Sequence, residues 1–274
     1  MWQAGVSALI AGFHGHVCLF AKNLETGVSF GVLEDEKVRT ASTIKLPVMV
    51  RVFRDVEAGR LRWDDTLILQ EEDVVSGSGV LQEMSPGMRF PVRDLVHLMI
   101  VVSDNTATNL LLDRVTTDAV NDEMDSLGLS ATRIMRKVMG GPHPPSGWSK
   151  AGKLPENQRF GLGSSTAKEM VTLLERIDRG EIVSPAASKE MLAILKRQQD
   201  EGGIRRKLRG VDVANKSGAL DRLRSDVGIV YSKAGPIALA ITVDEMAETD
   251  YSPDNPGLKL IADLTLLLVE GLKS

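Results

Sequence analysis

The apolar residues of this 274-residue chain change their period twice, and this change constrains the fold more than any other feature. Apolar and polar residues alternate early in the chain, over Val17–Lys22 and Val28–Leu33. The alternation returns late in the chain, over Val211–Ser217, Val227–Ser232 and Ile237–Val243. A period of two residues is typical of half-buried strands. The sequence therefore predicts strands at both ends of the chain.

Between these strands, apolar residues recur at helical spacing. The helical segments are separated by Gly, Pro, Asp or Ser and cover residues 42–58, 91–101, 104–115, 117–127, 165–178 and 185–199. Two more helices are expected over 2–11 and about 255–272. This order predicts an α+β fold in which both termini build one antiparallel sheet. We expect a sheet lobe of residues 1–48 and 205–274 and a helical lobe of residues 49–204, intertwined as one domain.

Composition and charge exclude several classes of partner. Apolar residues make up 43% of the chain and charged residues 26%, which is ordinary for a soluble globular protein. The net charge of -4 gives no reason to expect nucleic acid or a membrane as partner. No apolar run is long enough to cross a bilayer, and the N-terminus lacks the features of a signal peptide. We expect a periplasmic or secreted protein if a signal peptide was removed, and otherwise a cytoplasmic one.

The lone cysteine and the histidines bear on disulfides and metals. Cys18 is the only cysteine, so no internal disulfide can form. It lies in an apolar alternation, which favours a buried small side chain over a nucleophile. The four histidines, His14, His16, His97 and His143, show no metal-ligand spacing with acids or with the thiol. The sequence therefore predicts no metal site.

Three polar clusters carry the chemistry of the chain, and they occur in a fixed order. They are Ser42-Thr43-Ile44-Lys45, Ser103-Asp104-Asn105 and Lys216-Ser217-Gly218. Together they supply a hydroxyl with an amine one helical turn away, a second hydroxyl with an amide, and a cationic strand edge. Acyl transfer through a covalent serine ester needs these parts.

The first cluster offers a nucleophile and its base. A serine hydroxyl is a poor nucleophile unless a nearby base takes its proton, and residues three apart share one helical face. Lys45 can therefore approach Ser42, and burial with neighbouring positive charge would lower the pKa of the lysine. Ser165 and Lys168 show the same spacing, but Ser165 fits equally well as a helix cap or first-turn residue. Ser42 is preferred because the other two clusters accompany it.

The second and third clusters have structural as well as catalytic interpretations. Ser, Asp and Asn are preferred at helix N-caps, so the second cluster taken alone predicts a cap. In the catalytic interpretation, Ser103 passes a proton toward the leaving group, Asn105 donates its amide N–H to a substrate carbonyl, and Asp104 braces the loop. Lys216 and Ser217 would bind a substrate carboxylate by charge and hydroxyl.

With these clusters in this order, the chain resembles the class A β-lactamases and penicillin-binding proteins, which are serine hydrolases. Gly77–Leu81 and Asp226–Val230 agree with the same family, and the resemblance covers nearly the whole chain. It implies a β-lactamase/transpeptidase-like fold, with a five-stranded antiparallel sheet, flanking terminal helices and an inserted helical lobe. It also implies no metal or cofactor, a monomer, and a small-molecule substrate such as a β-lactam or a related amide or ester.

The resemblance also implies roles for individual residues. Ser42 forms the acyl-enzyme, and the backbone N–H groups of Ser42 and Ala219 form the oxyanion hole. Arg224 resembles the arginine that helps Lys216 to hold the substrate carboxylate.

One part of the family pattern is missing. Class A enzymes carry a Glu-x-x-Leu-Asn motif whose glutamate activates the deacylating water, and residues 140–163 contain no such motif. The acid in this region is Glu156, which would be either the missing base or a solvated loop residue. The sequence thus predicts a β-lactamase-type hydrolase, and two alternatives stay open. One is a DD-peptidase or esterase of the same fold, and the other is a penicillin-binding sensor that stays acylated.

Overall fold

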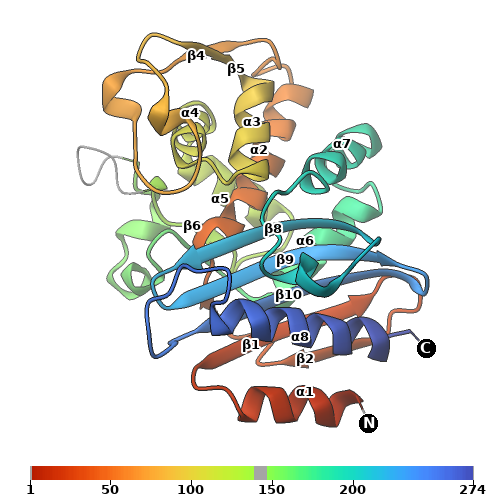
Figure 1. The fold of residues 1–274 in the computed structure, drawn as a ribbon. Coiled ribbons are helices and arrows are strands. Elements are labelled where there is room, and N and C mark those ends of the chain that lie inside the picture. The colour runs from red at the N-terminus through yellow and green to blue at the C-terminus, as the bar shows by residue number, and fades with distance from the viewer. Residues whose placement is uncertain (1, 139–146, 274) are drawn as a thin grey trace.

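The computed structural model describes residues 2–138 and 147–273, so His143 lies outside the described residues (Figure 1). Its main sheet has five antiparallel strands in the order β2-β1-β10-β9-β8. The strands are β1 (His16–Asn23), β2 (Ser29–Val32), β8 (Asp212–Leu220), β9 (Leu223–Ser232) and β10 (Gly235–Asp244). The prediction of an α+β fold with one antiparallel sheet built from both ends of the chain is confirmed. β8 is an edge strand, so one of its sides is free to form a wall of a site.

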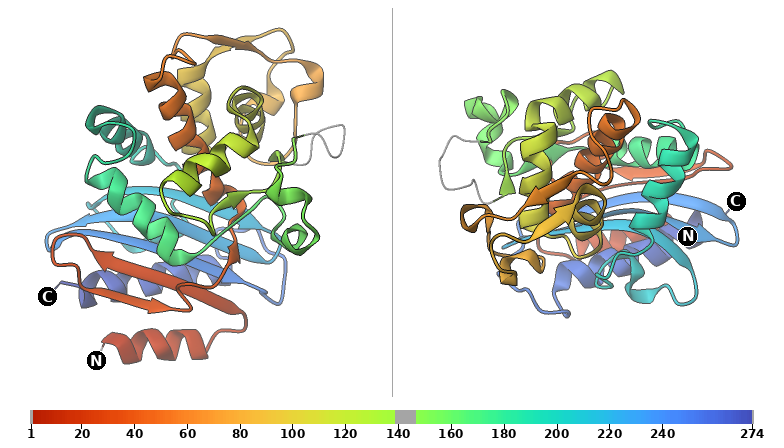
Figure 2. Two further views of the ribbon diagram at one scale, coloured as in Figure 1. Left: turned by 180° about the vertical axis from the view of Figure 1, so that it is seen from behind. Right: turned by 90° about the horizontal axis from the view of Figure 1, so that it is seen from above.

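The two terminal helices, α1 (Trp2–Ala11) and α8 (Pro256–Gly271), cover one face of this sheet (Figures 1 and 2). Val17 and Leu19 of β1 belong to the buried cluster that includes residues of both helices. Because side chains alternate along a strand, Cys18 of β1 points to the opposite face. Alternate side chains of β1 therefore face the two hydrophobic cores that lie on opposite sides of the sheet.

The opposite face of the sheet carries the helical part of the molecule. The helices are α2 (Lys45–Glu57), α3 (Val92–Val101), α4 (Asn105–Val115), α5 (Thr117–Ser126), α6 (Ala167–Asp178) and α7 (Pro185–Leu195). They share a second buried cluster, and α6 packs directly against β1 and β10. The first predicted helical segment is divided into a 3-10 turn, η1 (Ala41–Ile44), followed by α2. The boundaries that we predict for the two lobes stay a prediction.

Several short elements were not predicted. A three-stranded sheet joins β3 (Val38–Arg39), β7 (Gly163–Ser165) and β6 (Arg133–Ile134), and β4 (Thr66–Ile68) pairs with β5 (Arg89–Pro91). Further 3-10 turns are η2 (Glu71–Asp73), η3 (Leu81–Glu83), η5 (Ala151–Lys153), η6 (Pro155–Phe160) and η7 (Ile204–Lys207). These elements are too short to show a period.

The β3–β7 ladder positions the chain just before the first polar cluster. Its last rung is followed by a hydrogen bond of 3.0 Å from the Thr40 N–H to the Gly163 carbonyl. The ladder therefore holds the entry to η1, where Ser42 lies. Within residues 2–138 and 147–273, no helix combines the length and apolarity needed to cross a bilayer.

Candidate active site

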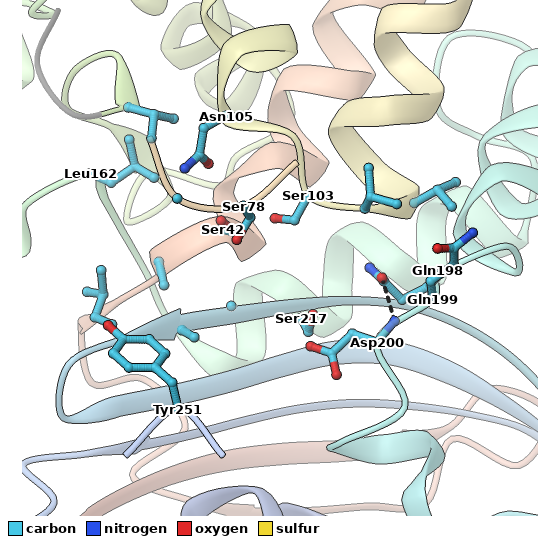
Figure 3. A pocket seen from close by; sticks show the side chains of 18 of the residues that line it. Ser42, Ser78, Ser103, Asn105, Leu162, Gln198, Gln199, Asp200, Ser217 and Tyr251 are labelled. Atoms are coloured by element: carbon cyan, nitrogen blue, oxygen red, sulfur yellow. Dashed lines mark hydrogen bonds between the residues drawn. The ribbon is translucent and has the colours of Figure 1, made fainter. Parts of the chain in front are cut away.

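The three polar clusters meet at a pocket of about 540 Å³ between the edge strand β8 and the helical part. Residues from every cluster line it, namely Ser42, Ser103, Asn105, Ser217 and Gly218, and Ala219 lines it directly after the third cluster. Figure 3 shows Ser42 and Ser103 grouped on one wall, with Ser217 on the strand below them. The structure thus brings together side chains that are far apart in the sequence.

Ser42 lies in η1, directly before the first turn of α2. Ala41, the residue before it, has φ of +46°, and Ser103 has φ of +55°. Left-handed backbone is unfavourable for residues other than glycine and tends to occur at functional sites. Thr43 Oγ1 donates to the Thr40 carbonyl at 2.8 Å and reinforces the turn. The nucleophile candidate is therefore held in a strained and well-anchored turn, with its N–H at the start of a helix.

Lys45 connects the first cluster to the second. Its side chain is fully buried. Its ammonium donates to the Ser103 carbonyl at 2.7 Å, to Ser103 Oγ at 3.1 Å and to Asn105 Oδ1 at 2.8 Å. Burial holds the pKa of Lys45 well below its usual value, the nearby Lys216 charge lowers it further, and Asp104 opposes both. An amine with a depressed pKa can lose its proton near neutral pH and then act as a base.

The contact between Lys45 and Ser42 differs from the predicted one. The spacing predicts that Lys45 approaches the Ser42 hydroxyl. In the described residues, the hydrogen bonds of the amine go to Ser103 and Asn105 instead. Ser42 and Ser103 line the same pocket, so the amine lies behind the wall on which both hydroxyls stand. Catalytic hydrogen bonds are often long before substrate binds.

Asp104 braces the loop, as predicted, and it also caps a helix. Its carboxylate accepts from the Ala107 N–H at 2.8 Å, which makes it the N-cap of α4. It also accepts from the N–H groups of Val80 at 2.7 Å and Leu81 at 2.9 Å. The structural interpretation of this cluster is therefore confirmed, and its catalytic interpretation stays a prediction. Asp104 fixes the loop, while Ser103 and Asn105 face the pocket.

Asn105 has one amide hydrogen left for a substrate. Its Oδ1 accepts from Lys45, and its Nδ2 donates to the Ser76 carbonyl at 3.0 Å. An amide nitrogen carries two hydrogens. The second hydrogen is therefore available for the predicted bond to a substrate carbonyl.

Strand β8 forms the opposite wall. Lys216 of β8 is fully buried and is absent from the lining of both pockets, and its ammonium donates to the carbonyl of the pocket residue Ser217 at 2.6 Å. Burial lowers the pKa of Lys216 to about 8, although Asp226 and Asp200 act in the opposite direction. Burial likewise raises the pKa of Asp226 to about 6. At neutral pH the wall is therefore positively charged at Lys216, as the prediction of a carboxylate site requires.

Gly218 allows β8 to approach the nucleophile turn. A Cβ atom at this position would lie 2.9 Å from the Thr40 carbonyl oxygen and 3.0 Å from the Ser42 nitrogen. Both neighbours are backbone atoms and cannot easily move aside. The absence of a side chain here therefore lets Ser42 and Ala219 line one pocket.

Arg224 lies in an adjoining pocket of about 500 Å³, which shares Ser217 and Ala219 with the first. Its guanidinium donates to the carbonyls of Leu220 and Leu223, each at 2.6 Å, and to the Asp250 carbonyl. It also stacks at 4.7 Å on the ring of Tyr251. Arg224 therefore adds positive charge beside the β8 wall, but its donors are directed to backbone carbonyls.

The structure does not bring Glu156 to the other predicted site residues. Glu156 lies in η6, is exposed, and is absent from the lining of both pockets. Phe160 is the buried residue of this turn, and Asn157 Nδ2 donates to the Ala151 carbonyl at 3.0 Å. These contacts leave Glu156 on the solvent side of the turn. Sequence proximity to Asn157 does not reveal which side of a 3-10 turn faces a pocket.

The lining also contains residues that the sequence analysis missed. They are Ser76, Val101, Val102, Val138, Leu162, Gln198, Gln199, Asp200, Leu220 and Tyr251. Most belong to connections, where no period marks a face of an element. Among the described lining residues there is no histidine or cysteine, and the one carboxylate is Asp200. In Figure 3, Asp200 and Gln199 lie toward one end of the pocket, and Leu162 and Asn105 toward the other.

The second match to the first cluster lies elsewhere. Ser165 is the last residue of β7, is buried, and lies with its Oγ 2.8 Å from Thr132 Oγ1. The cap of α6 is the next residue, Thr166, whose hydroxyl accepts from the Glu169 N–H at 3.0 Å. Ser165 therefore has a structural environment and no access to the pocket.

Comparisons with known proteins agree with this geometry. The model of the "Beta-lactamase enzyme family" matches residues 3–272. The crystal structure of a β-lactamase from Sphaerobacter thermophilus has a TM-score of 0.85 and 31% identity, covering 99% of this chain and 96% of that one. The structure of PBP-A has a TM-score of 0.84 and 25% identity, covering 98% and 95%. The β-lactamase CARB-3 of Pseudomonas aeruginosa is 23% identical over 244 residues, which are 87% of this chain and 80% of that protein. These likenesses confirm the predicted β-lactamase/transpeptidase-like fold.

Proposed function

The chain belongs to the beta-lactamase enzyme family, and we propose that it opens the amide of a β-lactam by forming an ester on Ser42. The observation that most supports this function is the buried amine of Lys45. It is held by Ser103 and Asn105 on the wall that Ser42 also lines. Nucleophilic catalysis requires a base near the attacking hydroxyl, and the Lys45 amine bonds the hydroxyl of Ser103 on the wall that Ser42 shares.

In the proposed acylation, Ser42 Oγ attacks the lactam carbonyl carbon and its proton passes to neutral Lys45. The N–H groups of Ser42 and Ala219 stabilise the negative charge that develops on the carbonyl oxygen. The carbon–nitrogen bond then breaks. Ser103 Oγ, 3.1 Å from the Lys45 amine, relays the proton from that amine to the leaving nitrogen.

Substrate orientation follows from the two walls of the pocket. Charged Lys216 and the Ser217 hydroxyl are proposed to hold the substrate carboxylate. The free amide hydrogen of Asn105 is proposed to bind a carbonyl on the opposite side of the substrate. Arg224 adds positive potential from the adjoining pocket.

A second candidate function is a penicillin-binding protein that remains acylated. The observation that favours it is the shortage of carboxylates that could activate a deacylating water. Glu156 is outside the pocket, and Asp200 is the one carboxylate among the described lining residues. Leu162, which lies on the Asn105 side, offers no base for a water molecule (Figure 3). The likeness to PBP-A is consistent with this candidate.

Two measurements on one mixture separate the candidates. The protein is mixed with excess penicillin, ring opening is followed by absorbance, and the intact mass is recorded over time. Ring opening of many equivalents with a transient adduct supports the hydrolase. Ring opening of one equivalent with a lasting adduct supports the slowly deacylating protein. Wild-type protein that neither opens the ring nor gains mass contradicts both.

A further inference from the structure

Three side chains with metal-binding atoms meet on the sheet, apart from the active-site pocket. His16 Nε2 lies 2.9 Å from Glu36 Oε1 and 3.4 Å from Cys18 Sγ. The three ligand atoms all lie within 4.8 Å of one another. None of these residues lines the pocket that contains Ser42.

The fold brings these residues together in two steps. His16 and Cys18 are two positions apart on β1, so their side chains point to the same face of the sheet. Glu36 comes from the connection between β2 and β3, which passes over this end of β1. A search for ligand spacing in the sequence does not find the group, because the carboxylate is twenty residues away from the imidazole.

We propose that His16, Cys18 and Glu36 bind one divalent transition-metal ion of the zinc type. One nitrogen, one sulfur and one oxygen ligand form a set that Zn²⁺ accepts, with a water as the fourth ligand. For tetrahedral Zn²⁺, usual bond lengths place the nitrogen and oxygen about 3.4 Å apart and the nitrogen and sulfur about 3.6 Å apart. The observed distances of 2.9 and 3.4 Å need to open by only a few tenths of an ångström.

The charges around Cys18 favour a cation. The thiol is buried, and the negative charges of Glu36 and Asp244 act on it. A metal ion replaces the proton of the thiol, which passes to solvent, and binds the lone pair of His16 Nε2 while Nδ1 keeps its hydrogen. Asp244 is already bound by Arg39 and supplies charge rather than a fourth ligand.

The bound ion would join β1 to the connection that leads into β3. Glu36 precedes Ser42 by six residues, and β3 anchors the nucleophile turn. We therefore expect the metal to raise the thermal midpoint of unfolding.

The test is a titration of the reduced protein with Co²⁺, followed by absorbance. Cys18 is the only cysteine, so a thiolate-to-cobalt charge-transfer band reports on this group alone. We expect the band to saturate at one ion per chain and to disappear when Zn²⁺, which binds such ligands more tightly, is added. Absence of the band at every Co²⁺ concentration overturns the proposal.

Matched variants show whether all three side chains are ligands. Cys18→Ser should abolish the band, and His16→Ala and Glu36→Gln should each weaken Co²⁺ binding by at least about tenfold. Glu36→Gln tests the site without disturbing the core, because Glu36 is exposed. The control is His14→Ala, which removes an exposed histidine two residues from His16 and should leave the titration unchanged. A band that survives unchanged in both His16→Ala and Glu36→Gln also overturns the proposal.

Discussion

Lys45 and Lys216 are both fully buried, and in both the burial disfavours the charged form. The consequences for the two residues are opposite. Loss of the proton gives Lys45 the role of a base, whereas Lys216 needs its proton to attract a carboxylate. The site therefore requires two buried lysines with different protonation states. Asp226 and Asp200 oppose the effect of burial on the pKa of Lys216 and help this lysine to keep its positive charge.

The first prediction concerns pH. Because the pKa of Lys216 is lowered to about 8, its positive charge is present below that pH and is lost as the pH rises through it. We expect KM for a β-lactam to rise about tenfold between pH ~7 and pH ~9, since the charged fraction falls by about that factor. Steady-state kinetics across this range measure it. Lys216→Arg, whose guanidinium stays charged, should give a KM that does not change with pH. A wild-type KM that is equally independent of pH would contradict the role of Lys216.

The second prediction concerns the deacylating base. Glu156 is exposed and outside the pocket, so Glu156→Gln should change acylation and deacylation by less than about twofold. Leu162→Glu places a carboxylate on the pocket wall and should accelerate deacylation by about 100-fold, which is the lower end of the range of general-base catalysis. Decay of the acyl-enzyme, followed by intact mass, measures both. Slower decay in Glu156→Gln would instead identify Glu156 as the base.

At the scale of elements, Asp104 joins the helix α4 to the loop that carries Val80 and Leu81. Its carboxylate is buried and accepts three backbone N–H bonds. Ser103 and Asn105 flank it, so the position of both pocket residues depends on this carboxylate. Loss of these bonds would affect stability and the site together.

The third prediction is that Asp104→Ala lowers the free energy of unfolding by about 3 kcal/mol. Loss of a helix cap costs about 1 kcal/mol, and each buried N–H left without a partner costs about as much or more. Urea unfolding measures the change. Thr117→Ala serves as a control, because it changes a buried helical residue whose hydroxyl forms no side-chain hydrogen bond within the described part of the chain. A loss in Asp104→Ala no larger than in this control would contradict the bracing role.

The long elements could be predicted from the sequence, and the short ones could not. The helices α2 to α7 and the strands β8 to β10 show a clear period over many residues. Strands such as β3 and β7 have two or three residues and show none. For the site, the order of the clusters along the chain predicted Ser42 and Ser103, and the structure places both on one pocket. Leu162 and Tyr251 could not be found, because connections bring them to the pocket without any pattern in sequence.

At the scale of the whole molecule, the site depends on a sheet that closes across the two ends of the chain. η1 follows the first strands, and β8 begins the last three. At Gly218, β8 lies so close to this turn that an added Cβ would be 3.0 Å from the Ser42 nitrogen. The catalytic arrangement therefore depends on the contact between an early turn and a late strand.

The fourth prediction tests this contact. Gly218→Ala adds a Cβ that would lie 3.0 Å from the Ser42 nitrogen, so β8 and η1 must separate. We expect the acylation rate constant to fall by about tenfold, because the neighbours must move by a few tenths of an ångström and a displacement of about 1 Å can cost about 100-fold. Stopped-flow kinetics with a β-lactam measure the rate. The control is Gly12→Ala, where a Cβ makes only an ordinary contact at 3.4 Å, and it should leave the acylation rate unchanged. Equal acylation rates in the two variants would contradict the role of the close approach.

The most direct test of the central claim is the location of the covalent adduct. Wild-type protein, Ser42→Ala and Lys45→Met are each mixed with a penicillin, and intact mass and peptide mapping record where the mass is added. We predict an adduct on the Ser42 peptide in wild type, none in Ser42→Ala, and formation slowed by about 100-fold or more in Lys45→Met. An adduct that forms equally fast in Ser42→Ala would contradict the account.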